Sequence, residues 1–274
     1  MTELHSLSME SLLEELTLKF YQLKQYLDSE INRNKDKSYL QNYLSFQYFP
    51  FFDYTDSIIN LYKKANYNAA TVLLRTLVEA HMYVNYFQIG DWKHKLSVLA
   101  KEGFDIKLKT VKALGEMIDK YPNLISNNPD SLLSKETIDE LVTLNEKRRS
   151  DVIIANNLSP NEKVPGLFDV ARECDEANIR GSVPGQFQQM YNLEYRYISP
   201  LAHLNLEGLH SLIDRDEKGD FVLSKFKNHK VLISESIEIC VALTKDLFEN
   251  KVIESEVPKI ISEIEELCKK YLAY

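Results

Sequence analysis

The sequence predicts an all-α fold, a multi-helix bundle packed around one central buried helix at about residues 66–89, on three observations. Only eight Gly and eight Pro punctuate the 274 residues, and this scarcity of turn residues does not suit a many-stranded sandwich or barrel. Apolar residues recur at helical spacing along most of the chain. One segment is apolar on nearly every side, which is typical of a helix buried in a core.

The first predicted helix covers residues 4–31. Leu16, Phe20, Leu23 and Leu27 recur at intervals of three or four with charged residues between them, which indicates an amphipathic helix. The polar run 32–38 ends it. A second helix is predicted after Pro50 and continues to Ala65.

The central helix is the third. Asn66 can cap its start and Gly90 can end it. The apolar residues between them cover nearly every side: Ala69, Ala70, Val72, Leu73, Leu74, Leu77, Val78, Ala80, Met82, Val84 and Phe87. We therefore predict that residues 66–89 lie at the centre of the bundle, with the other helices packed around them.

Shorter helices are predicted to follow the central one. They cover residues 93–102, 107–120, 134–150, 167–179, 186–199, 201–213, 227–250 and 256–272. Gly103 and the turn-rich stretch 121–130 separate the first three of these. The acidic link 214–220 contains a glycine and is predicted to form a surface turn or a small hairpin.

The chain is predicted to have three parts: an N-terminal amphipathic helix (1–36), a helical core domain (37–215) and C-terminal helices that pack on the core (216–274). The loop at 156–166 is the best internal candidate for a boundary. We favour one continuous domain, because the later helices are needed to cover the central one.

Charge and cysteine content restrict the classes of function. A net charge of −8 argues against broad, non-specific binding of nucleic acids. A local basic stretch runs from Asp91 to Lys112, where six lysines outnumber three acidic residues. The simpler interpretation of this stretch is a solvated helix face.

The three cysteines form no CxxC pair and indicate reduced thiols. Without a signal-peptide pattern or an apolar run of ~20 residues, we expect a cytoplasmic protein with no membrane contact.

Arg75 and Glu79 stand out within the central helix. They are four residues apart, so they lie on one helix face, close enough to pair directly. Leaving either charge unpaired in a core would cost several kcal/mol, roughly 3 to 5. The two residues therefore mark a polar pocket inside the bundle, or else a structural ion pair that fixes the packing of the helices.

A second polar group lies near residue 200. Tyr195, Ser199 and His203 follow one another at intervals of four and form one stripe on a helix, and Arg196 is seven residues from His203, which nearly aligns those two. Pro200 is expected to kink or restart this helix because it lacks an amide hydrogen.

No cofactor and no metal are expected. The chain has no GxxxxGK[ST], GxGxxG, GxSxG, HExxH or paired CxxC motif. Glu207 and His210 match the Glu-x-x-His spacing of carboxylate-bridged metal sites in helical bundles, but such sites need a second motif of this kind, which the sequence lacks.

The pattern Arg75-x-x-x-Glu79 in a buried helix, followed by Tyr195-x-x-x-Ser199-x-x-x-His203, resembles a bacterial all-helical family of unknown function over residues 40–215. That family is similar to the HEPN (higher eukaryote and prokaryote nucleotide-binding) domains, many of which are metal-independent ribonucleases with an Arg-x(4–6)-His motif. Two stretches fit this motif by count, Arg75 to His81 and Arg196 to His203. The first pair would lie about 120° apart on a regular helix and would not converge. The polar residue that commonly follows the Arg is matched only weakly by Thr76.

The resemblance implies a site formed by Arg75, Glu79 and His203, with Tyr195, Arg196 and Ser199 as binding or orienting groups. It implies an endoribonuclease or toxin of a bacterial defence or stress system that acts on RNA as a homodimer. The alternative is a non-catalytic helical module that senses a ligand or binds a protein partner, in which Arg75 and Glu79 are a structural pair.

Overall fold

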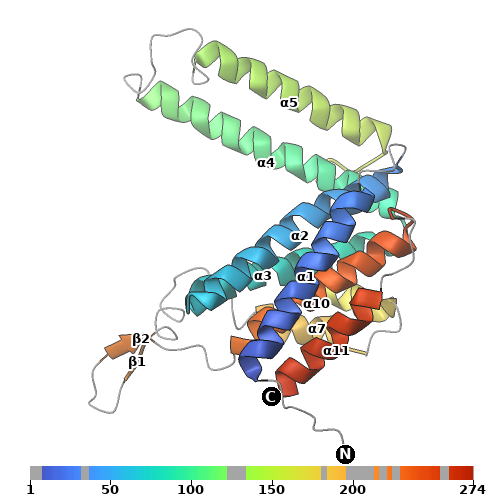
Figure 1. The fold of residues 1–274 in the computed structure, drawn as a ribbon. Helices are drawn as coiled ribbons and strands as arrows, with labels where there is room; N and C mark the ends of the chain where they lie inside the picture. Colours follow the sequence, from blue (N-terminus) through green and yellow to red (C-terminus); the bar gives the residue numbers. More distant parts are fainter. Residues whose placement is uncertain are drawn as a thin grey trace, which may run out of the picture. The chain divides into compact units, whose positions relative to one another are not determined.

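The computed structural model describes residues 8–31, 37–121, 134–179, 184–195, 213–215, 221–223, 229–253 and 259–273. These residues are almost entirely helical, which confirms the all-α class (Figure 1). By contact the chain divides into two compact units, Met1–Tyr86 with Leu167–Tyr274, and Phe87–Gly166. The second unit ends at Gly166, the last residue of the loop at 156–166.

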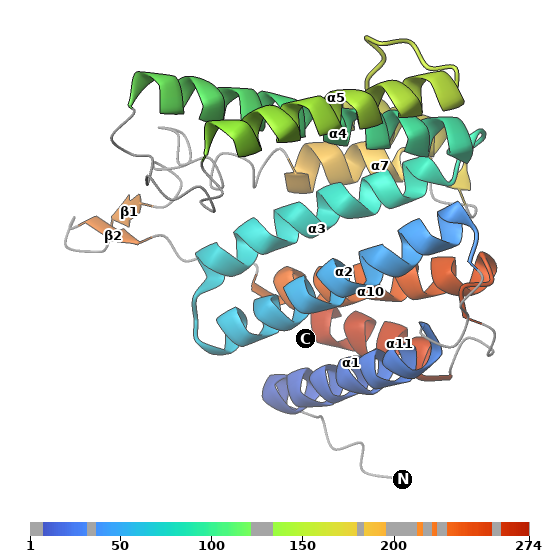
Figure 2. The same cartoon turned by 90° about the horizontal axis from the view of Figure 1, so that it is seen from above.

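The first unit contains two pairs of helices that pack side by side. Helix α1 (Met9–Ile31) packs along α11 (Lys259–Ala273), and α2 (Tyr39–Lys63) packs along α10 (His229–Glu249) (Figure 2). The predicted apolar stripe of α1 is buried, and Lys19 Nζ lies 2.6 Å from Glu263 Oε2 across the α1–α11 contact. The C-terminal helices thus pack directly on the N-terminal ones.

Helix α2 corrects the sequence prediction, which placed its start after Pro50. The helix begins at Tyr39 and contains Pro50. Ser38 and Gln41 form a reciprocal capping box at its start, in which each side chain accepts a hydrogen bond from the other residue's backbone amide. Tyr48, Phe51 and Phe52 around Pro50 are buried, and their burial outweighs the one backbone hydrogen bond that proline removes.

Helix α3 (Tyr67–Phe87) is the predicted central helix, and its burial is confirmed. Thr76 is the one exposed residue within it. Figure 2 shows α3 between the α2–α10 pair and helix α7 (Gln186–Gln189). At its side, the Cys174 thiol of α6 (Leu167–Glu176) lies 3.8 Å from the Met82 carbonyl oxygen.

The predicted helix over 186–199 is helical as far as Tyr195, in a different form from the one expected, and residues 196–199 lie outside the described residues. Helix α7 has only four residues, and a π-helix, η3 (Met190–Tyr195), follows it directly. The predicted helix at 201–213 lies outside the described residues apart from Ile213. That residue begins strand β1 (Ile213–Arg215), which pairs antiparallel with β2 (Phe221–Leu223), so the hairpin alternative for the link is confirmed.

The second unit contains two long helices that lie side by side, α4 (Trp92–Lys120) and α5 (Lys135–Ala155). The prediction of two helices separated by Gly103 is wrong, because α4 continues through this glycine. A glycine inside a helix costs only about 0.5–1 kcal/mol relative to alanine, which is too little to interrupt a helix that buries Lys101 before it and Leu108 after it.

The three cysteines are free thiols, as predicted, and all three are buried. Burial raises the pKa of the Cys240 thiol to about 12, against a smaller opposing effect of its hydrogen bond with Thr55. Within the described ranges, no helix is both long and apolar enough to cross a membrane.

Candidate functional site

Arg75 of α3 contacts Tyr195 at the end of η3. Its Nη2 donates a hydrogen bond to the Tyr195 hydroxyl oxygen at 2.7 Å. The guanidinium carbon also lies 4.6 Å from the centre of the Tyr195 ring, within range of a cation–π interaction. The Arg75 side chain is half-buried. These two contacts hold the guanidinium in one orientation and join two motifs that are 120 residues apart in sequence.

Tyr195 ends a row of three aromatic rings, which we call the aromatic row. Its ring stacks on that of Tyr191, with centres 5.6 Å apart and an interplanar angle of 17°. The Tyr191 ring in turn lies 5.5 Å from Phe168 of α6, at a tilt of 59°. Phe168 is 44% exposed, so the row runs from the half-buried Arg75 to the surface of the first unit.

Local features at the start of α7 position this row. The Asp175 carboxylate accepts hydrogen bonds from the backbone amides of Phe187 at 2.9 Å and Gln188 at 3.0 Å, which ties the first turn of α7 to α6. Gly185, directly before α7, has φ of +81°, in the left-handed region that favours glycine. Together they set the direction of α7 and η3, and hence the place of Tyr195.

The π-helical form of η3 is the feature that sequence reasoning missed. Single π-helical turns are rare and occur frequently at functional sites. The spacing Tyr191-x-x-x-Tyr195 signalled that two rings share a helix face, but aromatic residues at helical spacing are usually core residues. What distinguishes this pair is its contact with Arg75, which only the tertiary structure reveals.

Glu79 lies one helical turn after Arg75 and is also half-buried. Among the contacts of the described residues, no ion pair joins the two side chains; the hydrogen bond from Arg75 crosses to Tyr195 instead. The two residues therefore share a face of α3, as predicted, without pairing directly.

His81, the partner of Arg75 in the first Arg-x(5)-His stretch, contacts a different segment. It is buried, and its ring stacks on Phe187 of α7 with centres 6.2 Å apart. Its backbone carbonyl accepts a hydrogen bond from Asn85 Nδ2 at 2.8 Å. Because Arg75 contacts η3, the two side chains do not converge, as their helical spacing predicts.

The other predicted site residues, Arg196, Ser199 and His203, lie outside the described residues, as do Glu207 and His210. The structure brings together Arg75 and Tyr195 and places Glu79 on the same face of α3. In the part of the chain with described placement, no group of three or more His, Cys, Asp or Glu residues is arranged to hold a metal ion.

The geometry can provide an anion-binding group. A guanidinium carries a planar fork of donors that matches phosphate oxygens, and a fixed orientation reduces the entropy lost on binding. Tyrosine rings beside it offer surfaces on which a base can stack. The arrangement therefore suits a ligand that carries both a phosphate group and a flat base.

These features define an all-α helical protein in which an arginine of the central buried helix is held by a tyrosine of a π-helix. The family model that matches the chain, over residues 41–220, is that of a family of unknown function, DUF5677. The match covers most of the chain and includes both α3 and η3, and the chain belongs to this family. Comparisons with curated proteins and with solved structures gave no match.

Proposed function

We propose that the chain is a HEPN-like, metal-independent endoribonuclease of a bacterial defence or stress system, acting in the cytoplasm as a homodimer. The observation that supports this proposal is the contact between Arg75 and Tyr195. It brings the arginine of the central helix to the segment that continues, within eight residues, to His203. On this proposal the two groups that phosphodiester cleavage needs, the Arg75 guanidinium and the His203 imidazole, act together in one site.

The roles follow from the chemistry of RNA cleavage. The ribose 2′-oxygen attacks the adjacent phosphorus, a 2′-O–P bond forms and the P–O5′ bond breaks, which leaves a 2′,3′-cyclic phosphate and a 5′-hydroxyl. His203 carries out one of the two proton transfers, taking the proton from the 2′-hydroxyl or giving one to the leaving 5′-oxygen, and water carries out the other. Arg75 stabilises the charge that builds on the phosphate oxygens in the transition state.

The remaining site residues position these two groups. Tyr195 holds Arg75 through its hydroxyl and its ring. Glu79 lies on the same face of α3, and its carboxylate is proposed to orient the histidine. Arg196 and Ser199 are proposed to bind the phosphodiester beside the reacting group.

The test is cleavage of total RNA by the purified chain in EDTA. Wild type is compared with Arg75→Ala and His203→Ala, and with Arg172→Ala as the matched control. Arg172 is a half-exposed arginine of the same unit that pairs with Asp169. It has no role in the proposed site. We expect losses of roughly 10²-fold or more for the two site variants and normal activity for the control. Absence of cleavage by wild type, or equal cleavage by all four proteins, would refute the proposal.

A second candidate is a non-catalytic module in which Arg75 is structural. The aromatic row supports it, because Arg75 packs on Tyr195 and thereby holds η3 against α3. On this hypothesis Arg75→Ala lowers the melting temperature while wild type leaves RNA intact.

The homodimer of the first proposal is tested separately, by light scattering of the wild-type protein.

A further inference from the structure

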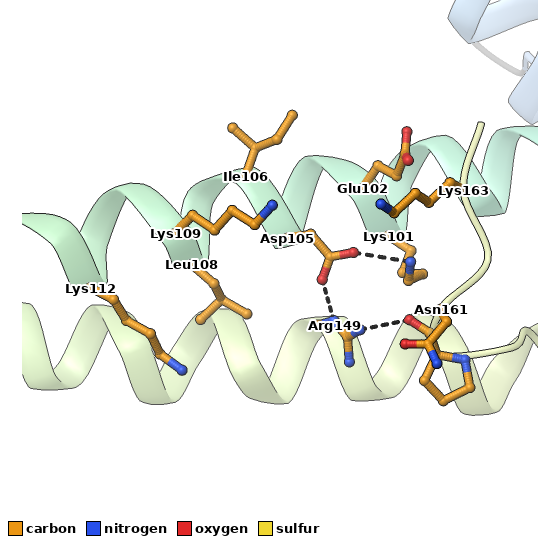
Figure 3. A pocket seen from close by; sticks show the side chains of 11 residues that line it. Lys101, Glu102, Asp105, Ile106, Leu108, Lys109, Lys112, Arg149, Asn161 and Lys163 are labelled. Atoms are coloured by element: carbon orange, nitrogen blue, oxygen red, sulfur yellow. Dashed lines mark hydrogen bonds and ion pairs between the residues drawn. The ribbon is translucent and has the colours of Figure 1, made fainter. Parts of the chain in front are cut away.

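A cavity of about 710 Å³ lies in the second unit, between α4, α5 and the segment that follows α5 (Figure 3). Five cations line it: Lys101, Lys109, Lys112, Arg149 and Lys163. Two acids, Glu102 and Asp105, also line it and leave an excess of three positive charges. This local charge is opposite in sign to the net charge of −8 on the whole chain.

A network of ion pairs and hydrogen bonds around Asp105 fixes the shape of this cavity. Lys101 is 1% exposed, and its Nζ lies 3.0 Å from Asp105 Oδ2 and donates to the Glu162 carbonyl oxygen at 2.6 Å. Arg149 Nε donates to Asp105 Oδ1, and its Nη2 donates to the Pro160 carbonyl oxygen at 2.9 Å. Asp105 is therefore shared by two cations. The network connects α4, α5 and the following segment and leaves little negative charge on Asp105 to compete for the other cations.

Among the described residues, no acidic side chain pairs with two of the lysines in the cavity. Lys109 extends from α4 and Lys163 from the segment after α5, and their ammonium groups enter the cavity from different sides (Figure 3). Both are exposed, and among the residues that the structure describes neither forms an ion pair. Lys112, by contrast, pairs with Glu146 at 2.8 Å. Lys109 and Lys163 are thus free to bind an anion between them.

We propose that this cavity binds a small ligand with two or more phosphate groups, such as inorganic triphosphate or a nucleoside triphosphate. Its volume falls within the range of about 300–1,000 Å³ for small-molecule sites. Phosphate groups in a chain suit cations that are spread along a cavity, whereas one phosphate would reach only some of them. The site is independent of the ribonuclease proposal, which rests on Arg75 in the other unit.

A small ligand fits these features better than an RNA strand. Single-stranded nucleic acids bind to grooves in which aromatic side chains stack on the bases. None of the described residues that line this cavity is aromatic. The negative charge of the whole chain also opposes a long polyanion, whereas a ligand of cavity size experiences mainly the local positive charge.

The test is calorimetric titration of the full chain with sodium tripolyphosphate, ATP and orthophosphate. The variant Lys109→Gln/Lys163→Gln removes two charges that form no ion pair with a described residue, and it leaves the network around Asp105 intact. Its matched control is Lys107→Gln/Lys147→Gln, which removes two exposed lysines of α4 and α5 that do not line the cavity. We expect tripolyphosphate to bind at least tenfold more tightly than orthophosphate. We also expect about a tenfold loss in the first variant and less than a twofold change in the control.

The comparison of the three ligands shows which kind of phosphate compound the cavity binds. Tighter binding of ATP than of tripolyphosphate identifies a nucleotide site, and equal binding identifies a site for the phosphate chain alone; both support the proposal. It is overturned if wild type binds neither at 1 mM, if orthophosphate binds equally well, or if the control variant loses as much affinity. It is also overturned if an RNA 12-mer displaces tripolyphosphate at a lower concentration than ATP does.

Discussion

Asp105 is the residue whose replacement should most sharply test the network of the second unit. Asp105→Asn keeps the shape of the side chain and removes the charge that lies between Lys101 and Arg149. Lys101 is then left as a buried cation whose described remaining contact is the Glu162 carbonyl oxygen. The substitution should therefore destabilise this unit and leave the first unit unaffected.

The expected loss in the free energy of unfolding follows from how deeply Lys101 and Asp105 are buried. Removing one partner of a fully buried ion pair costs about 3–5 kcal/mol. Lys101 is 1% exposed but Asp105 is 29% exposed, and Lys101 keeps its hydrogen bond to the carbonyl oxygen, so the cost should be lower. We expect a loss of about 2–3 kcal/mol in the free energy of unfolding.

Trp92 provides the assay, because it is the single tryptophan of the chain and begins α4 within the second unit. Its fluorescence would follow urea unfolding of wild type and variant. With an m-value of about 1 kcal/mol/M, the expected loss lowers the midpoint by about 2–3 M. Asp119→Asn is the matched control: its partner Lys135 is exposed on the same helix pair, and no measurable change is expected.

The pH dependence supplies a second test of the same reasoning. Burial by itself would raise the pKa of Asp105, but hydrogen bonds from Arg149 and Lys101, together with their charges, outweigh it and hold the pKa below its ordinary value of 3.8. A carboxyl with a depressed pKa in the folded state stabilises the fold above its ordinary pKa and loses that effect as the pH falls below it. The difference between wild type and Asp105→Asn should thus be constant from pH 7 to 5 and shrink below pH 3.8. A destabilisation under about 1 kcal/mol at pH 7, or one that grows as the pH falls, would refute this account.

Three further predictions concern both units. Gly103→Ala should raise the stability of the second unit by about 0.5–1 kcal/mol, because the new Cβ would meet no atom within 4 Å; a decrease in the urea midpoint would contradict this. Tyr195→Phe keeps the ring against Arg75 but removes the 2.7 Å hydrogen bond, and should cost about 1 kcal/mol in a denaturation followed by circular dichroism; an unchanged midpoint would show that the bond contributes nothing. Ellman's reagent at pH 8 should label none of the three buried thiols in the folded chain and all three in urea, since burial raises the pKa of Cys240 and of Cys268 to about 12; fast labelling of the folded chain would be incompatible with their burial.

The helices could be predicted from the sequence wherever apolar residues recur at helical spacing over several turns. The stripe from Leu16 to Leu27 and the apolar segment around Leu74 and Leu77 correspond to α1 and α3 as observed. Burial of such faces contributes more free energy than local propensity does, so the pattern alone indicates the element.

Single residues that usually break helices misled the prediction for the same reason. Pro50 and Gly103 each cost a helix at most a few kcal/mol, and both lie inside long helices that bury other apolar residues. The true start of α2 did have a local signal, since Ser38 and Gln41 have the spacing of a capping box.

The candidate site was only partly predictable. Arg75, Glu79 and Tyr195 stand out as polar groups in or near apolar helices, and this much needs no structure. The contact between Arg75 and Tyr195 depends on the packing of α3 against a π-helix, and neither has a local pattern that reveals it. The aromatic row was missed because stacked rings on one helix face look the same in sequence as core residues.

The packing of α1 along α11 has a consequence for synthesis on the ribosome. The two helices are separated by the residues between Ile31 and Lys259, which take roughly 10–50 s to translate at ~5–20 residues per second. During that time the side of α1 that α11 later covers has no native partner. A nascent chain of this protein is therefore expected to depend on a ribosome-associated chaperone until α11 has emerged.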